Sequence, residues 1–426
     1  MWCPIAGQID MLPMGDISRR RIVAEPNDRA PLRSVLYLSY DGMLEPLGQS
    51  QVLAYLESLA MTRPIHLMSF EKPKDWADVT LRNRVQARMD GAGIQWHPRR
   101  YHRRPSALAT SWDIGVGVLL GLWLIIRHRL AIVHARSYVA GVMALPLLWM
   151  TGARFLFDMR GLWADERVDG GLWPCDGRMY QLAKWFERRL LTRADHVVSL
   201  TNAAVSEIER FPYLRNAMPP VSVIPTCADL ARFAPVAPPD GPFVLGYVGS
   251  TGTWYLFDAV VACFAQLRTM RPDARFLVVN RGEHAYVLDR LSAGGVPMDA
   301  VEVRAADHAE VPAQMARMHA GVFFIKPVFS KQASAPTKLG EFLGCGIACL
   351  SNTGVGDMAA ILEGDRVGVA IDEFGPSALA NGLTRLLLLV AEENVRSRCV
   401  AAAITHFSLD GGVAQYNRIY QLLDKE

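Results

Sequence analysis

The sequence contains little cysteine and almost no excess of positive over negative charge. Each of these two features excludes a class of protein. Seven cysteines scattered over 426 residues do not suit a small disulfide scaffold, and no His or Cys pair beside them completes a tetrahedral metal site. The 45 Lys and Arg residues nearly balance the 42 Asp and Glu residues, which leaves a formal net charge of +3. The scattered cysteines therefore predict no metal site. The balanced charge predicts no nucleic-acid partner, because the chain offers no strong electric field to a polyanion.

Long hydrophobic runs are also missing, since none reaches the roughly 20 residues that a bilayer-spanning helix requires. Residues 114–126 and 138–150 come closest, and we expect both to be buried helices of an α/β domain. An alternative for the first run is docking on an anionic membrane surface. The basic residues on its two sides, which favour that alternative, are His102, Arg103, Arg104, Arg127, His128 and Arg129.

The first residues of the chain contain no continuous apolar core of signal-peptide length and no clear cleavage site. Their mixture of Gly, Pro, Arg and Asp predicts a flexible extension over residues 1–33. Because the scattered cysteines are typical of free thiols, a reducing compartment fits best. The sequence therefore predicts a cytoplasmic protein.

Short apolar or β-branched runs alternate with longer amphipathic segments along most of the chain. In the first half, strands are predicted at residues 35–39, 65–69, 131–134, 154–157, 196–200 and 221–224. Helices are predicted at residues 49–61, 79–89, 113–128, 138–150, 178–192 and 202–210. Strands that alternate with helices in this way form a parallel sheet covered on both faces.

A proline-rich stretch at residues 234–242 interrupts this alternation and predicts a linker. Beyond it, strands are predicted at residues 243–249, 274–280, 321–326, 347–351 and 367–371 and near Val301, and helices at 255–270, 336–344 and 376–392. We therefore predict an α/β protein with two Rossmann-like domains, residues 34–233 and 243–404, facing each other across a cleft. Ligands of open parallel sheets bind beyond the carboxyl ends of the strands, so the facing loops should hold the site.

The most informative segment is residues 323–357, where a strand is followed by a polar loop and by a helix that begins near Pro336. Proline suits the first helical turn because its missing N–H would have no partner there. The start of such a helix presents free N–H groups and the positive end of the helix dipole. The polar side chains around it are Lys326, Ser334, Thr337 and Lys338. Together these features predict a binding site for a diphosphate.

Glu341 lies one helical turn beyond Lys338, where it could accept hydrogen bonds from ribose hydroxyls. The alternative is a surface ion pair between the two. Two glycine-containing turns favour ligand binding, because glycine lets the backbone approach a ligand closely. One turn is residues 354–357, and the other contains Gly249, Ser250 and Thr253. A purely structural turn between a strand and a helix would look much the same as the second.

Polar residues also follow several very apolar strands of the first half, which is typical of a binding site. The loop after the first strand contains Gly42, Gly48, Gln49 and Ser50. The ends of later strands and the residues that follow them contain His134, Arg136, Asp158, Arg160, Asp165 and Glu166. The alternative is a solvated rim held by ion pairs.

Six segments of the chain, in their order, resemble the family 4 glycosyltransferases, which have the GT-B fold. They are YDGMLEPLGQSQVL, HARSY, FDMRGLWADERVDGG, VIPTCADLARF, YVGSTGTWYLFD and SAPTKLGEFLGCG. The resemblance implies retaining transfer of a sugar from a nucleotide-activated donor, without an obligatory metal or another cofactor. It also implies that the second domain binds the donor, that the first binds the acceptor, and that a helix within residues 405–426 packs back on the first domain.

The sequence departs from this family in its charged residues. The family commonly has two glutamates separated by seven residues; Glu341 matches the second, whereas Ala333 stands at the first. Ser250 stands where many members have an arginine, and no lysine follows it closely. Lys338 and Lys326 are therefore expected to supply the positive charge for the diphosphate.

The histidine that the family has after a strand of its first domain has no clear counterpart here, and His134 is a candidate substitute. The expected catalytic residues are His134, Arg136, Asp158, Arg160 and Glu166. The expected donor-binding residues are Gly249, Ser250, Thr253, Lys326, Ser334, Thr337, Lys338 and Glu341. The expected acceptor-side loop contains Gly42, Gly48, Gln49 and Ser50.

The predicted function is that of a hexosyltransferase. It would move a sugar from a nucleotide-diphosphate sugar to a glycan or lipid-linked acceptor in cell-surface polysaccharide synthesis, with peripheral association at the inner face of the cell membrane. Two alternatives stay open. One is a nucleotide-sugar epimerase or hydrolase of the same fold. The other is an inactive scaffold protein that binds sugar nucleotides. Ala333, which stands where the family has a glutamate, favours this alternative.

Overall fold

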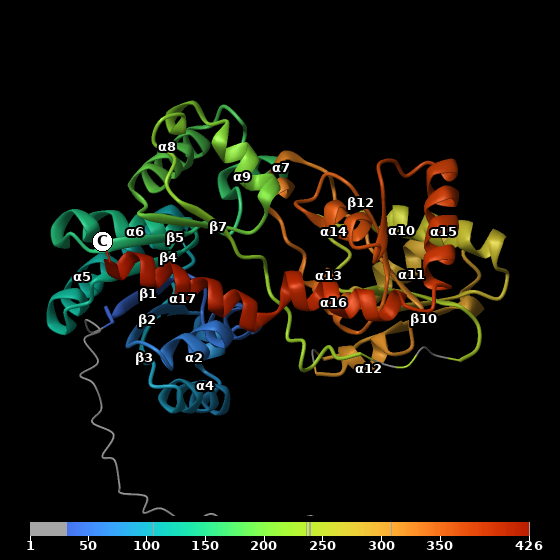
Figure 1. Cartoon of the computed structure of the whole chain (residues 1–426), viewed down its shortest axis with the longest axis horizontal. Coiled ribbons are helices and arrows are strands. Elements are labelled where there is room, and N and C mark those ends of the chain that lie inside the picture. Colours follow the sequence, from blue (N-terminus) through green and yellow to red (C-terminus); the bar gives the residue numbers. More distant parts are fainter. Residues whose placement is uncertain (1–31, 105, 236, 238–239, 308, 426) are drawn as a thin grey trace, which may run out of the picture. The chain divides into compact units, whose positions relative to one another are not determined.

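The computed structural model describes residues 32–104, 106–235, 237, 240–307 and 309–425 (Figure 1). The predicted flexible extension lies outside the described residues, except for residues 32 and 33. From Arg33 onward the chain forms two parallel sheets, one of seven strands and one of six, with helices between the strands. The predicted α/β class with two Rossmann-like halves is confirmed.

The first sheet has the strand order β3-β2-β1-β4-β5-β6-β7. Its strands are β1 (Val35–Ser39), β2 (Ile65–Glu71), β3 (Gln95–Arg100), β4 (Ile132–Arg136), β5 (Arg154–Asp158), β6 (His196–Ser199) and β7 (Val221–Val223). β1 is an inner strand, with Val35 opposite both Ile65 of β2 and Ile132 of β4. Every residue of β1 is buried, because helices cover both faces of a parallel sheet.

Helices cover the two faces of this sheet in separate layers (Figure 1). On one face lie α5 (Ser106–His128), α6 (Ser137–Thr151) and α8 (Arg178–Arg193). On the other lie α2 (Ala54–Ala60), α4 (Val79–Gly91) and α17 (Leu409–Lys425). Leu36 packs in the first layer and Tyr37 in the second, as the two-residue period of a strand requires. The C-terminal helix α17 therefore forms part of the core of the first half.

The other helices of the first half are short. They are α1 (Pro46–Gly48), the π-helix η1 (Gln49–Leu53), α3 (Pro73–Trp76), α7 (Trp163–Asp169), α9 (Asn202–Glu209) and the 3-10 helix η2 (Pro212–Leu214). The helix predicted over residues 49–61 is thus a π-helix at its start and an α-helix only from Ala54.

α5 is longer than predicted, because it begins at Ser106 and has 23 residues. By length and composition alone, Ala107–His128 is the one helix among the described residues that could cross a membrane, which corrects the expectation that no segment is long enough. Of its most apolar window, 33% is buried inside the protein. Leu124 and Ile125 pack on the first sheet, so α5 is also a core helix.

The second sheet has the strand order β10-β9-β8-β11-β12-β13. Its strands are β8 (Val244–Val248), β9 (Arg275–Val279), β10 (Val301–Arg304), β11 (Ala320–Val322), β12 (Cys349–Asn352) and β13 (Gly368–Ile371). The helices are α10 (Phe257–Met270), α11 (His284–Ala293), η3 (Met298–Ala300), α12 (Val311–Met315), η4 (Phe329–Ala333), α13 (Thr337–Gly344), α14 (Met358–Gly364), α15 (Pro376–Val390) and α16 (Val395–Phe407). This order is that of a doubly wound nucleotide-binding sheet.

Candidate active site

The predicted donor residues come from elements that meet at one edge of the second sheet. β8 and β11 are neighbours in the sheet although β9 and β10 separate them in sequence. The strand order reverses between them, and ligands of doubly wound sheets bind at such a point. Gly249 directly follows β8, and Lys338 of α13 lies beside it.

The Lys338 side chain is buried next to the turn at Gly249, with 8% of the residue exposed. Its Nζ atom lies 3.7 Å from the ring centroid of Tyr255 and 5.0 Å from that of Tyr247. A Cβ atom on Gly249 would lie only 3.2 Å from Nζ, so the glycine leaves this atom uncovered on one side. Nζ has no hydrogen-bond partner among the described residues. A buried ammonium group without an acceptor is costly, and a bound anion would remove that cost.

Glu341 follows on the same face of α13 and is half-buried. Burial lowers the pKa of Lys338 to about 7, against the opposing effect of Glu341. Burial likewise raises the pKa of Glu341 to about 7, against the opposing effect of Lys338. Because Lys338 is buried and its Nζ atom is unpartnered, the alternative of a surface ion pair is wrong.

Glu283, which the sequence analysis missed, lies beside the turn at Gly249. Its Oε2 atom accepts hydrogen bonds from the Thr251 amide at 2.9 Å and from Asn280 Nδ2 at 2.7 Å. Desolvation acts to raise the pKa of Glu283, but these hydrogen bonds outweigh it and the pKa lies below its ordinary value. One N–H group of the turn, that of Thr251, therefore already donates to a carboxylate of the protein. A signal was present in the sequence, because Glu283 follows a strand at the predicted edge.

The remaining predicted donor residues lie around the start of α13 and the turn after β8. Pro336 is the N-cap residue of α13 and no side chain caps the helix, while Ser334 and Thr337 beside it are half-buried. Thr253 is exposed and has a φ of +50°, which is uncommon for a residue with a side chain. Ser250 and Lys326 are also exposed. Their role in donor binding stays a prediction.

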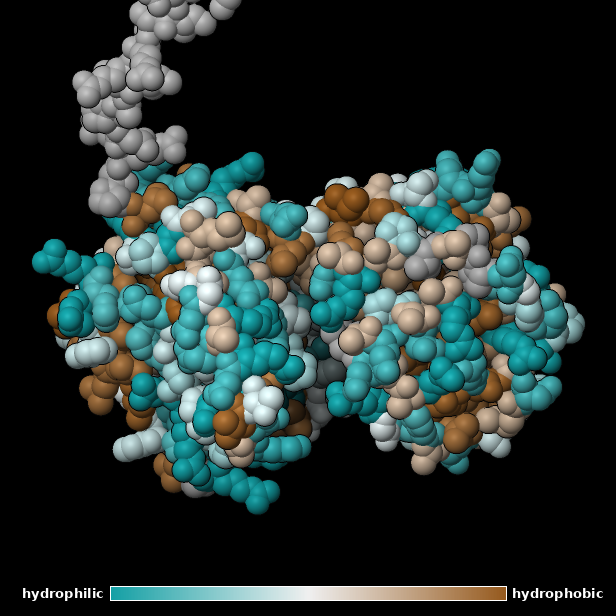
Figure 2. Space-filling model, turned by 90° about the horizontal axis from the view of Figure 1, so that it is seen from below, coloured by the Kyte–Doolittle hydropathy of each residue, from teal (hydrophilic) through white to brown (hydrophobic). Residues whose placement is uncertain are grey.

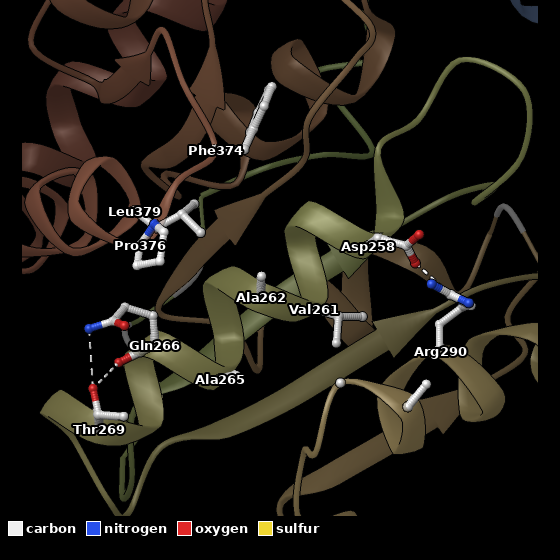
Figure 3. A pocket seen from close by; sticks show the side chains of 12 residues that line it. Asp258, Val261, Ala262, Ala265, Gln266, Thr269, Arg290, Phe374, Pro376 and Leu379 are labelled. Carbon is white, nitrogen blue, oxygen red and sulfur yellow. Dashed lines mark hydrogen bonds and ion pairs between the residues drawn. The ribbon is translucent and has the colours of Figure 1, made fainter.

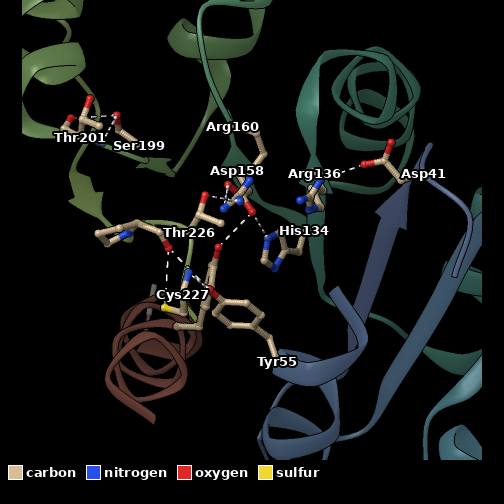
Figure 4. A network of polar contacts seen from close by, with 12 residues as sticks. Asp41, Tyr55, His134, Arg136, Asp158, Arg160, Ser199, Thr201, Thr226 and Cys227 are labelled. Atoms are coloured by element: carbon tan, nitrogen blue, oxygen red, sulfur yellow. Dashed lines mark hydrogen bonds and ion pairs between the residues drawn. The ribbon is translucent and has the colours of Figure 1, made fainter. Parts of the chain in front are cut away.

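Asp158, the last residue of β5, and His134, in the middle of β4, lie in a buried polar cluster (Figure 4), and each is 1% exposed. The Tyr416 hydroxyl donates to Asp158 Oδ2 at 2.9 Å, and His134 Nδ1 lies 2.7 Å from the Tyr420 hydroxyl oxygen. Both tyrosines come from α17, so the C-terminal helix covers these two side chains. Their burial favours a supporting role beneath the site over direct contact with a substrate.

Arg136 and Arg160 belong to the same cluster (Figure 4). Arg136 Nη1 donates to Asp41 Oδ2 at 2.8 Å, and Arg160 Nη1 lies 3.9 Å from Asp158 Oδ1. Desolvation would raise the pKa of Asp158, but the positive charges around it, that of Arg160 first, hold the pKa below its ordinary value. Arg160 has a φ of +57°, and strained backbone of this kind gathers at functional sites. The cluster therefore holds two guanidinium groups against an ionised carboxylate.

Glu166 and Asp165 lie next to each other in α7 but have different partners. Glu166 Oε1 accepts from Lys331 Nζ of η4 at 2.8 Å, and Lys331 Nζ also stands 3.7 Å from the ring centroid of Trp254. Asp165 pairs with Lys184 of α8 at 2.9 Å inside the first half. Glu166 therefore faces residues of the second half, whereas Asp165 fits the alternative of a structural ion pair.

The predicted acceptor-side loop is held by its own backbone and by Glu71, a buried carboxylate that the sequence analysis missed. Glu71 accepts from the amides of Met43 and Leu44 at 2.8 and 3.1 Å. A Cβ atom on Gly48 would lie 2.0 Å from the Gly42 carbonyl oxygen, so only glycine fits this close approach. The side chains of Gln49 and Ser50 bond to carbonyl groups of the same loop. These hydrogen bonds and the close approach at Gly48 hold the loop in one conformation.

One further cavity, of about 480 Å³, lies in the second half between α10, α11 and the start of α15 (Figure 3). Asp258 and Arg290 form an ion pair of 2.6 Å at its side, and Val261, Ala262 and Leu379 line its apolar part. It contains none of the predicted donor residues. Among the described residues, no group of three His, Cys, Asp or Glu side chains is placed to hold a metal ion.

In a comparison with known protein families, residues 75–227 match the family described as "Glycosyl transferase 4-like domain". The predicted resemblance to family 4 glycosyltransferases is confirmed. A comparison with curated proteins found no match.

Several solved structures share the GT-B fold with this chain. A glycosyltransferase from Rickettsia africae has 13% identity and a TM-score of 0.67, with 92% of this chain and 98% of that chain covered. A sucrose-phosphate synthase from Thermosynechococcus elongatus has 15% identity and a TM-score of 0.68, with 92% and 99% covered. HepE from Anabaena, solved with UDP-glucose, has 14% identity and a TM-score of 0.61, with 91% and 99% covered. At these identities the structures support the fold alone.

Proposed function

Given that this chain is a glycosyltransferase of the GT-B type, with a glycosyl transferase 4-like domain in its first half, we propose that it transfers a hexose with retention of configuration. The donor is a nucleotide-diphosphate sugar held by the second half. The acceptor is a glycan or a lipid-linked sugar used in cell-surface polysaccharide synthesis, and the enzyme works at the cytoplasmic face of a membrane.

The unpartnered Nζ atom of Lys338 carries this proposal. It is buried beside Gly249, at the point of the second sheet where doubly wound folds bind ligands, and it has no acceptor among the described residues. The start of α13 adds amide groups that no side chain caps. A diphosphate would accept hydrogen bonds from Lys338 Nζ and from these amides. HepE from Anabaena, which shares the fold, was solved with UDP and with UDP-glucose.

Charge develops on the diphosphate as the bond between the sugar and the phosphate oxygen breaks. Lys338 and the first amides of α13 would stabilise that charge, which accelerates the reaction because the stabilisation is greatest in the transition state. In retaining transfer the acceptor attacks on the face of the leaving group, and the departing phosphate takes the acceptor proton. No step needs a metal in this scheme.

The acceptor side is assigned to the first half. Arg136, Arg160 and Glu166 end or follow strands β4 and β5 of the first sheet, where the order of that sheet reverses between β1 and β4. The two arginines would bind an acceptor with negative charge, and the buried Asp158 and His134 beneath them would fix their position.

Binding of uridine diphosphate to Lys338→Ala and Glu341→Ala, measured by calorimetry, tests the donor site. Lys338→Ala should weaken binding and lower kcat about 100- to 1000-fold, by analogy with the loss of an oxyanion donor. Glu341→Ala should weaken binding of the nucleotide but not of pyrophosphate. Lys74→Ala, at an exposed lysine of α3, is the matched control. Unchanged affinity in both site variants would remove the assignment.

A screen of nucleotide sugars by thermal shift would identify the donor, because a ligand at 100 times its dissociation constant adds about 2.7 kcal/mol to the free energy of unfolding. The preferred donor should then give a product of retained anomeric configuration by NMR when an acceptor is present. Free or isomerised sugar formed without an acceptor would instead identify a hydrolase or an epimerase.

A further inference from the structure

α5 presents a continuous apolar stripe on the outside of the first half. Its members are between 55% and 72% exposed and are Leu108, Trp112, Leu119, Trp123 and Ile126. Their spacings of three, four and seven residues place them on one face of the helix. Large exposed apolar patches mark interaction sites in soluble proteins.

The opposite face of α5 is occupied by the protein itself. A Cβ atom on Gly117 would lie 2.7 Å from Met143 Sδ, and one on Gly121 would lie 2.8 Å from Leu147 Cδ1, so the two glycines bring α5 close to α6. The one acidic residue of α5, Asp113, is buried and accepts from the Tyr40 hydroxyl at 2.9 Å. The stripe therefore carries no negative charge, and the helix cannot leave the sheet without exposing its packed face.

The neighbouring helices of the same layer extend this surface. Trp149 near the end of α6 is 82% exposed, and Met179, Leu182 and Trp185 on α8 are each about half exposed. α6 lies between the other two helices, because it packs against both. Figure 2 shows hydrophobic residues gathered at the left of the molecule, the side on which α5 and α6 lie in Figure 1. These exposed apolar side chains of α5, α6 and α8 are called the docking face below.

Positive charge lies at both ends of α5. Arg103 and Arg104 precede α5, Arg127 lies in its last turn, and Arg129 follows it; all four are exposed. A hollow of about 420 Å³ opens where α5 and α6 end, with Arg129 and Arg33 beside Ile126 and Met150. Apolar side chains next to arginines are what a phosphate headgroup and its acyl chains would contact.

We propose that the docking face lies in the surface of an anionic phospholipid bilayer, with α5 parallel to the membrane plane. Exposed tryptophans suit the boundary between headgroups and acyl chains, and the arginines suit anionic lipids. The burial of one side of α5 opposes a spanning orientation. A second copy of the chain is a poorer occupant, because the same arginines would then face each other. The inference deepens the proposed function, in which the acceptor is on a membrane.

Sedimentation of the full chain with vesicles tests this proposal. We expect binding to vesicles of phosphatidylcholine with phosphatidylglycerol, and weak binding to phosphatidylcholine alone. Leu119→Gln with Trp123→Gln should lower the binding about tenfold or more, since it removes two side chains from the apolar contact. Arg104→Glu with Arg127→Glu should reduce binding to anionic vesicles only, by about fivefold per arginine removed. Leu388→Gln, at an equally exposed leucine of α15, is the control.

Uridine diphosphate binding, measured on every variant, separates this proposal from the donor site. Variants that keep nucleotide binding and lose vesicle binding support the docking face. Wild-type vesicle binding by the Leu119→Gln, Trp123→Gln variant would overturn it, as would a failure of the unaltered chain to bind anionic vesicles. Resistance of the membrane-bound chain to extraction at high pH would point to a spanning helix. A dimer in sedimentation velocity that this double variant abolishes would assign the face to a second copy.

Discussion

At Lys338, burial disfavours the ammonium form in the free protein and lowers the pKa to about 7. A bound diphosphate favours that form and raises the pKa. Nucleotide binding above neutral pH should therefore take up a proton, and the affinity should fall as the pH rises from 7 to 9. Calorimetry at pH 8 in buffers of different ionisation enthalpy measures this uptake directly.

Two variants separate Lys338 from its neighbour in this experiment. Glu341→Gln removes the other group whose pKa lies near 7 and should keep the proton uptake above pH 7. Lys338→Ala should abolish the uptake along with most of the affinity. Binding enthalpies that are independent of the buffer in the unaltered protein would contradict a lysine that is neutral before the ligand arrives.

At the scale of elements, α17 brings two tyrosines from the end of the described chain to Asp158 and His134 in the first sheet. Tyr416 donates to the ionised Asp158, whereas Tyr420 bonds to His134, whose pKa burial lowers. Hydrogen bonds to charged groups are the stronger kind. Tyr416→Phe should therefore cost about 1.5–3 kcal/mol of the free energy of unfolding, and Tyr420→Phe about 0.5–1.5 kcal/mol. Urea unfolding with unchanged m values measures the difference, and an equal or reversed order would contradict the assigned charges.

The same elements show what the sequence can predict. The strands β1 and β8 were predictable because buried parallel strands are runs of apolar residues. The start of α13 was predicted to within one residue, since Pro336 is its N-cap residue rather than part of its first turn. The partners of Asp158 were not predictable, because Tyr416 lies 258 positions away and only the packing of α17 brings it there. Burial of Lys338 was also missed, because the aromatic residues around it come from β8 and the loop after it rather than from α13.

On the scale of the whole molecule, residues of one half complete the local structure of the other. The Asp357 carboxylate, which follows β12 in the second half, accepts from the Asn202 amide at 2.7 Å and from the Ala203 amide at 2.9 Å. Those amides begin α9 in the first half, and Thr201, the N-cap residue, accepts from Ala204 at 3.1 Å. Helix capping is usually local, so no sequence pattern near α9 predicts this contact.

Asp357→Ala should therefore release the first turn of α9 without unfolding either sheet. The loss of a capping carboxylate costs about 0.5–2 kcal/mol, because it leaves helical N–H groups without an acceptor. Hydrogen exchange should become faster at the Asn202 and Ala203 amides. The Ala204 amide still donates to Thr201 Oγ1 in this variant, so it serves as the internal control and its exchange rate should change less. If all three amides kept their protection, the two halves would not depend on each other through this carboxylate, and α9 would be stabilised by its own residues alone.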